Sequence, residues 1–342
     1  MDGFFDKYGR VIIIAVAICF VLLYLTPMRN VVGSSINGFA GNFANKVGES
    51  IGAVKMPDGS DNIKREPSSM LIKANSIYTD DTSLFDRKIP SSATKILFTD
   101  EKAPNGVSTV DLTVAQDGDV VGWLDGTTWK VSTQDSKKSI AFNTNSSWMF
   151  YRCENIKEIQ FNNIDTSQVT TMDNMFRECP NLTSLDLSNF DTSKVTNMNA
   201  MFSGCSNLTS LDLSSFDTSN VKDMSAMFSE CKNLKELDLS NFNTSNVTTM
   251  GFMFEKCLNL KSLNLSGWDT TKVRDMEQMF FDCSKLTSLD LSSFDTSNIK
   301  NMCGIFHYCT KLNFVKVRSQ TDLEYLKSID IIGSPNIKFE IA

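Results

Sequence analysis

The residues of this chain that could do chemistry recur every 26 positions and fall into two columns. Carboxylates form one column, in which Asn264 interrupts Asp186, Asp212, Asp238 and Asp290. Thiols form the other column, at Cys153, Cys179, Cys205, Cys231, Cys257, Cys283 and Cys309. Carboxylates can serve as general acids, general bases or cation ligands, and thiols can pair as disulfides or bind metals. The meaning of both columns depends on the structure that repeats with them.

Catalysis is not predicted from these residues. Hydrolysis of a glycosidic bond needs two carboxyl groups in different environments about 5–10 Å apart in a cleft. The repeated aspartates would share one environment on an open surface. His307 is the only histidine, so it is the one candidate for histidine chemistry. The sequence predicts neither an enzyme nor a cofactor.

The overall charge argues against nucleic acid as a partner. The chain of 342 residues carries a net charge of −7 and has a pI near 4.9. Proteins that bind nucleic acid usually present a basic patch, which this composition does not indicate.

The thiol column is predicted to be buried and reduced. Each cysteine occupies the same inward position of its unit, where a small apolar group fits. Seven is an odd number, and pairing neighbours would distort an otherwise uniform stack. Zinc is not expected, because no CxxC motif and no histidine partner accompany these cysteines.

The carboxylate column allows two interpretations. Like charges stacked about 4.8 Å apart repel each other. Either neighbouring serines and water screen them, or the column is a striped face for a basic partner or a divalent cation. A second acidic column opens the following turn and is interpreted as a set of backbone caps. Its members are Asp191, Asp217, Asp269 and Asp295.

The unit that repeats has a strand half and a helix half. In residues 181–206, Leu185 and Leu187 alternate with polar residues, which is typical of a strand. Beyond the turn, apolar residues are spaced 3, 4 and 3 apart, which predicts one face of a short helix. These residues are Val195, Met198, Phe202 and Cys205. The Phe and Met columns of this half are predicted to be core.

A 26-residue period predicts a solenoid, in which each unit buries its apolar stripe against its neighbours. The predicted fold class is α/β: a leucine-rich-repeat solenoid with a parallel strand and a short helix in each unit. Seven units are expected over residues 146–317. A small β-rich cap is expected over 93–145, with hairpin turns at Asp117-Gly118 and Asp125-Gly126, and a C-terminal cap over 318–342.

The unit LxxLDLSxFDTSxVxxMxxMFxxC resembles the repeats of the BspA-like, 26-residue leucine-rich-repeat surface proteins of bacteria. The resemblance covers about half of the chain. It implies a cell-surface protein built for contact, and adhesion is the role usually suggested for that family.

The first 30 residues are predicted to be a signal-anchor. Residues 11–28 are uncharged and approach the length of about 20 needed to cross a bilayer. A cleaved signal peptide, giving a secreted protein, is the alternative. No small-x-small cleavage site follows Leu25, which favours the anchor. A flexible linker is expected over 31–92, and the C-terminal part is expected outside the cell.

The function expected from these observations is an adhesin-like cell-surface binding protein whose partner is an extracellular protein or glycan. The alternative is a structural surface or pilus-associated spacer without a dedicated ligand. The contact residues are expected on the outward face of the strands, and no metal-binding residues are expected. The predicted contact residues are Ser184, Asp186, Ser210, Asp212, Glu236, Asp238, Ser262, Asn264, Ser288 and Asp290.

Overall fold

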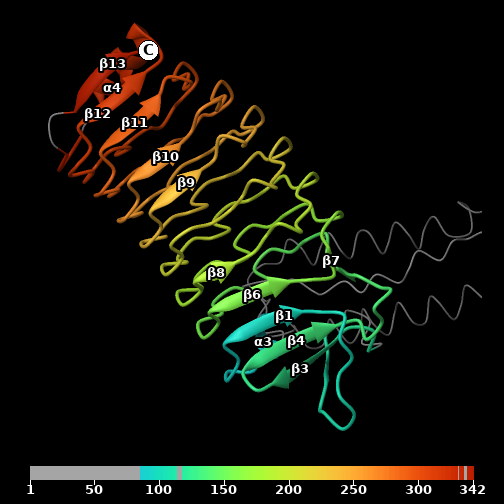
Figure 1. Ribbon diagram of the computed structural model, residues 1–342. Coiled ribbons are helices and arrows are strands. Elements are labelled where there is room, and N and C mark those ends of the chain that lie inside the picture. The colour runs from blue at the N-terminus through green and yellow to red at the C-terminus, as the bar shows by residue number, and fades with distance from the viewer. Residues whose placement is uncertain (1–84, 114–117, 330, 335–336) are drawn as a thin grey trace, which may run out of the picture. The chain divides into compact units, whose positions relative to one another are not determined.

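The computed structural model describes residues 85–113, 118–329, 331–334 and 337–342 (Figure 1). Within this part each 26-residue unit forms one coil, and the coils lie side by side in a row. The unit 181–206 shows why they stack. Leu182, Leu187 and Phe202 are at most 1% exposed, so the apolar side of each coil is covered by its neighbours. The predicted inward columns of leucine, phenylalanine, methionine and cysteine are confirmed.

The strands that cross the coils are short and parallel. Strand β6 (Glu158–Phe161) pairs with β8 (Ser184–Leu185), and β9 (Glu236–Asp238) pairs with β10 (Ser262–Asn264). Strands β11 (Ser288–Leu291), β12 (Phe314–Val317) and β13 (Lys338–Ile341) form a third group. Residues 210–213 form no strand.

The described strands thus form separate sheets rather than one. The Oδ1 atom of Asp186 accepts the backbone N–H of Ser188 at 3.0 Å, which keeps this donor from the neighbouring coil. The same bond occurs at Asp212, in the coil without a strand, and at Asp238, in a coil with one. It therefore does not explain where the sheet is broken.

The prediction of a helix in each repeat is wrong. Among the described residues the α-helices are α3 (Phe85–Lys88) and α4 (Gln320–Ser328), which lie outside the repeats. Residues 197–205 form consecutive turns instead. We call this segment and its equivalents in the other coils the turn ridge.

Hydrogen bonds in the turn ridge alternate between two directions. The N–H groups of Ala200 and Phe202 donate to carbonyls of the next coil at 2.8 and 2.9 Å. The N–H groups of Met201 and Ser203 instead close turns within their own coil. Ala200 has φ 51° and Gly204 has φ 77°, so a left-handed residue recurs every fourth position. Turns of four residues thus reproduce the 3-4-3 spacing that indicated a helix.

The continuous parallel ladder of the molecule runs along this ridge. Single bridges connect consecutive coils from Asn145 through Thr171, Asn197, Asp223, Thr249 and Asp275 to Asn301.

The N-terminal strands join the repeats in one sheet. Strand β1 (Lys95–Phe98) lies between β4 (Thr128–Ser132) and β6 and is parallel to both. Strands β3 (Val121–Asp125) and β4 form an antiparallel hairpin through Gly126, which has φ 60°. The described residues belong to one compact unit with a common core.

The remaining N-terminal elements are short. Strand β2 (Val110–Asp111) pairs with β3 at the edge of this sheet, and β5 (Ile140–Ala141) pairs with β7 (Ile164–Asp165). Helix α3 is anchored by Phe85, whose ring packs on Phe98 and Phe150 at 6.0 and 5.4 Å.

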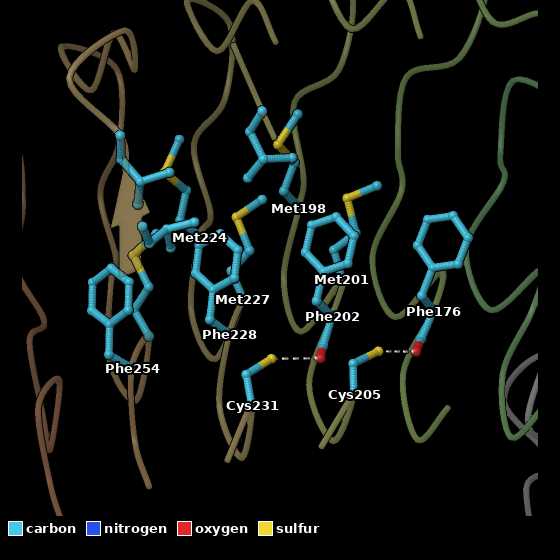
Figure 2. Packing of buried hydrophobic residues seen from close by; sticks show 14 of the residues in the cluster. Phe176, Met198, Met201, Phe202, Cys205, Met224, Met227, Phe228, Cys231 and Phe254 are labelled. Atoms are coloured by element: carbon cyan, nitrogen blue, oxygen red, sulfur yellow. Dashed lines mark hydrogen bonds between the residues drawn. The ribbon is translucent and has the colours of Figure 1, made fainter. Parts of the chain in front are cut away.

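The core contains a stack of phenylalanine rings, one from each coil. Neighbouring ring centroids lie 5.2–6.0 Å apart, with interplanar angles of 16° or less. The stack consists of Phe150, Phe176, Phe202, Phe228, Phe254, Phe280 and Phe306. Figure 2 shows part of this stack with the methionines and cysteines beside it.

The predicted membrane segment at 11–28 and nearly all of the predicted linker lie outside the described residues. In the part of the chain that is described, no helix has the length and hydropathy needed to cross a bilayer.

Candidate binding face

The ten predicted contact residues lie on the outward side of the strand half of the coils. All ten are exposed, and the leucines between them point inward or are partly buried. The 26-residue period therefore places one serine or glutamate and one aspartate or asparagine at equivalent positions in each of five coils. We call these ten residues the strand face.

Each aspartate of the strand face also closes a turn. One carboxylate oxygen accepts the backbone N–H of the serine two positions later, at 2.9–3.0 Å. Asn264 does the same with its amide oxygen, at 3.1 Å from Ser266 N. The backbone thus fixes the orientation of each carboxylate.

These hydrogen bonds lower the pKa of the aspartates further below neutral pH. The bonds from Ser188 lower the pKa of the Asp186 carboxyl, and Ser214 and Ser240 do the same for Asp212 and Asp238. At Asp290 burial opposes the shift, but the bonds from Ser292 and the charge of Lys316 lower its pKa as well. The strand face therefore presents a row of negative charges at neutral pH.

The row ends at the C-terminal side with a change of sign. Lys316 takes the aspartate position in the next coil, and its Nζ lies 4.0 Å from Asp290 Oδ2. Phe314 takes the neighbouring serine position. The row of negative charges therefore ends at the coil that contains Asp290.

The second acidic column consists of caps, as predicted. Asp191 Oδ1 accepts from the backbone N–H and the hydroxyl of Ser193 at 3.0 and 2.6 Å. Asp217, Asp269 and Asp295 make the equivalent backbone bond at 2.9 Å.

The cysteine column lies in the core and cannot contribute to this face. Each thiol from Cys179 to Cys309 donates to the carbonyl of a phenylalanine in the preceding coil, as Cys205 does to Phe176 O at 3.1 Å (Figure 2). Burial raises the pKa of Cys231 and Cys309 to about 12. Over the described ranges, no group of three or more His, Cys, Asp and Glu side chains could hold a metal ion.

Two polar ladders that the sequence analysis did not predict hold the coils in register. The buried Thr192 hydroxyl donates to Asp217 O and accepts from Asp217 N, both at 2.9 Å. The same pattern recurs where Thr166 meets Asp191 and where Thr270 meets Asp295. The threonine that recurs in the Asp-Thr-Ser sequence of the unit is the signal from which this ladder could have been predicted.

The second ladder joins asparagine side chains at the start of each unit. Asn233 Nδ2 donates to Asn207 Oδ1, and Asn259 Nδ2 donates to Asn233 Oδ1, both at 3.2 Å. Asn207 begins an Asn-Leu-Thr sequence, whereas Asn233 and Asn259 begin Asn-Leu-Lys sequences, so the asparagine at this position bridges neighbouring coils in both cases.

The coils, inward columns and inter-coil ladders define a leucine-rich-repeat-like solenoid of parallel strands. A family model described as "Mycoplasma protein of unknown function, DUF285" matches residues 144–262 and 232–326, together more than half of the chain. The chain belongs to this family. The matched residues include the repeats whose unit resembles that of the BspA-like proteins.

Two solved structures are similar to the chain at low identity. One is a leucine-rich cell surface protein from Faecalibacterium prausnitzii, with 16% identity and a TM-score of 0.38. The match covers 66% of this chain and 48% of that one. The other is a leucine-rich repeat protein from Bacteroides ovatus, with 16% identity and a TM-score of 0.32, covering 59% and 60%. The chain thus spans about half of the first protein's length. No match was found among curated proteins.

Proposed function

We propose that this protein is a bacterial cell-surface binding protein whose strand face contacts an extracellular partner. The observation that carries the proposal is the row of oriented, ionised carboxylates on one side of the coils. A row of negative charges repeated along the coils suits a partner with several cationic groups, because many weak contacts add through avidity.

A structural spacer is the second candidate, and one observation favours it. Every aspartate of the strand face already closes a turn, so the column has a role within the fold without any ligand. The two functions differ in what removal of the charge does. Loss of charge weakens binding but leaves a spacer unaffected, provided that the turns persist.

Asn264 shows how to remove the charge while keeping the turn. We therefore propose a variant with Asp186→Asn, Asp212→Asn, Asp238→Asn and Asp290→Asn. A matched control neutralises four acids of the turn ridge, with Asp223→Asn, Asp275→Asn, Glu277→Gln and Glu230→Gln. Asp223 and Asp275 also cap turns through Oδ1, so their asparagine variants keep those caps.

The full-length chain and both variants are used to capture proteins and glycans from extracts of host-cell surfaces and of bacterial surfaces. We expect components that the native chain and the control retain to be lost from the strand-face variant. Equal capture by all three proteins would reject the strand face as the binding surface. A component lost only from the control would place binding on the turn ridge.

The surface location is proposed with residues 11–28 as the membrane anchor. Protease added to intact cells is expected to release a fragment that contains the repeats. Protection of the repeats until the cells are lysed would overturn this topology.

A further inference from the structure

A cavity of about 440 Å³ lies at the N-terminal end of the repeats. Helix α3 and the segment after it form one wall, and the turn at residues 151–156 forms the other. The polar groups used below belong to Ser91, Tyr151, Arg152, Glu154 and Asn155, and Asp86 and Arg87 add one charge of each sign to the lining. We call this cavity the N-terminal pocket. Its volume is in the range of small-ligand sites.

The pocket arises where segment 86–93, rather than a regular repeat coil, packs before the turn at 151–156. In later units the equivalent turn packs against the coil before it. Asn181 Nδ2, for example, donates to Glu154 O of the preceding coil at 2.8 Å. Asn155 occupies the same position in the first unit and donates to Ser91 O at 3.0 Å. The strand face repeats in five coils, whereas this combination of residues occurs once.

The walls are rigid where they meet the core. Phe85 holds α3 against the phenylalanine stack and is 2% exposed. On the opposite wall, Tyr151 packs edge-on against Trp148, with ring centroids 4.9 Å apart. The Arg152 guanidinium lies 5.7 Å from the Tyr151 ring centroid.

The polar groups of the pocket have both charges and both hydrogen-bonding roles. Arg152 is a donor and Glu154 an acceptor, with Nε and Oε1 4.0 Å apart and both side chains more than half exposed. The Nε of Arg152 lies closer to Glu178 Oε2, at 3.0 Å, which leaves its two terminal nitrogens as the donors for a ligand. Asn155, which also lines the pocket, has a side-chain oxygen that can accept a hydrogen bond. A cationic ligand would be repelled by Arg152, and an anionic ligand would be repelled by Glu154. A hydroxyl group can donate to Glu154 and accept from Arg152, so a polyhydroxylated neutral molecule suits the set.

We propose that the N-terminal pocket binds an uncharged saccharide. One or two sugar rings fit the size class of the cavity. A pyranose also has an apolar face that can pack on a tyrosine ring and a hydroxyl rim that can hydrogen-bond to the mixed polar groups. This site is separate from the strand face and does not depend on the function proposed for it.

The test uses the full-length chain and saturation-transfer NMR. The neutral probes are lactose, maltose, cellobiose and N,N′-diacetylchitobiose. N-acetylneuraminic acid and glucosamine serve as anionic and cationic probes. We expect transfer to at least one neutral probe and a Kd that rises about tenfold or more in Tyr151→Ala, a loss typical of one well-packed contact. Glu154→Gln, at an exposed position, should weaken the same probe severalfold.

The matched control is Tyr308→Ala, which removes an exposed tyrosine from the turn ridge of the last full unit. It should leave binding unchanged, as should the four-asparagine variant of the strand face. The proposal is overturned if no neutral probe shows transfer, or if only a charged probe binds. It is also overturned if Glu154→Gln and a folded Tyr151→Ala both bind as the native chain does. Should Tyr151→Ala fail to fold, Glu154→Gln and Glu154→Ala decide the outcome.

Discussion

The Asp322 carboxylate accepts hydrogen bonds from both the backbone nitrogen and the hydroxyl of Thr296, at 2.9 and 2.7 Å. In earlier coils, the hydroxyl of the equivalent threonine bonds to the backbone of the following coil, as Thr270 does to Asp295. Asp322, at the start of α4, thus replaces a following coil at the C-terminal end of the threonine ladder. Its other oxygen is held by Arg318 and Ser319.

Acid should weaken this cap. Burial tends to raise the pKa of Asp322, but hydrogen bonds from Arg318, Ser319 and Thr296 outweigh it and lower the pKa from 3.8 to about 2. The folded state therefore binds the proton less tightly than the unfolded state does. The cap should stabilise the fold fully above pH about 4 and lose about 2 kcal/mol as the pH falls to about 2.

Chemical denaturation of the native chain and of Asp322→Asn across this pH range measures the effect. Near neutral pH, Asp322→Asn should be less stable than the native chain, and the difference should shrink as acid protonates the native carboxyl. A difference that does not vary with pH would contradict this account.

The thiols of the cysteine column should resist alkylation in the folded protein. They are buried, and burial raises the pKa of Cys231 and Cys309 to about 12, which leaves little of the reactive thiolate. Cys303 is exposed and provides an internal reference. Peptide mapping after iodoacetamide treatment should show label at Cys303 in native protein, and at the seven column cysteines only after denaturation. Peptides joined by disulfides in unreduced protein would contradict the prediction.

Asp186→Asn should leave stability almost unchanged, because Asn264 makes the same turn with its amide oxygen. Asp186→Ala removes the acceptor for the Ser188 N–H and should cost about 0.5–1 kcal/mol, the net value of one hydrogen bond. Urea unfolding midpoints of the two variants provide the comparison. Equal losses would mean that charge, rather than the turn bond, sets the role of this residue in the fold.

Phe228→Ala should destabilise the solenoid by about 3–5 kcal/mol, since it opens a cavity in the ring stack. Phe252 offers a matched control. It is only partly buried and has φ 60°, and alanine occupies the equivalent position at Ala200 and Ala226. Phe252→Ala should therefore cost much less. Thermal unfolding followed by circular dichroism distinguishes the two, and equal shifts of the midpoint would argue against the stack as a main source of stability.

The sequence predicted the period and the inward columns, because a buried apolar residue must recur in every coil. It did not predict the turn ridge. Four-residue turns and an α-helix place Met198, Phe202 and Cys205 on one side with almost the same spacing. The turns differ from a helix in the left-handed backbone conformation at Ala200. An alanine in the sequence does not indicate that conformation.

The sequence also predicted the exposed positions of the strand face, because leucine alternates there with serine and aspartate. It did not predict the breaks in the sheet, because residues 210–213, which form no strand, have the same Ser-Leu-Asp-Leu sequence as strand β11. The N-terminal pocket also could not be predicted. It joins residues near Asp86 to residues near Tyr151, and no periodic pattern links those segments.

The alternation of hydrogen bonds along the turn ridge has an evolutionary consequence. Inner coils offer the same pattern of donors to one neighbour and acceptors to the other, so an internal coil can be duplicated or deleted in frame without leaving a mismatched junction. The two ends are different, because α3 and Asp322 each fit only the coil beside them. Size variants within the family are therefore expected to gain or lose whole coils from the middle, while both ends are inherited intact.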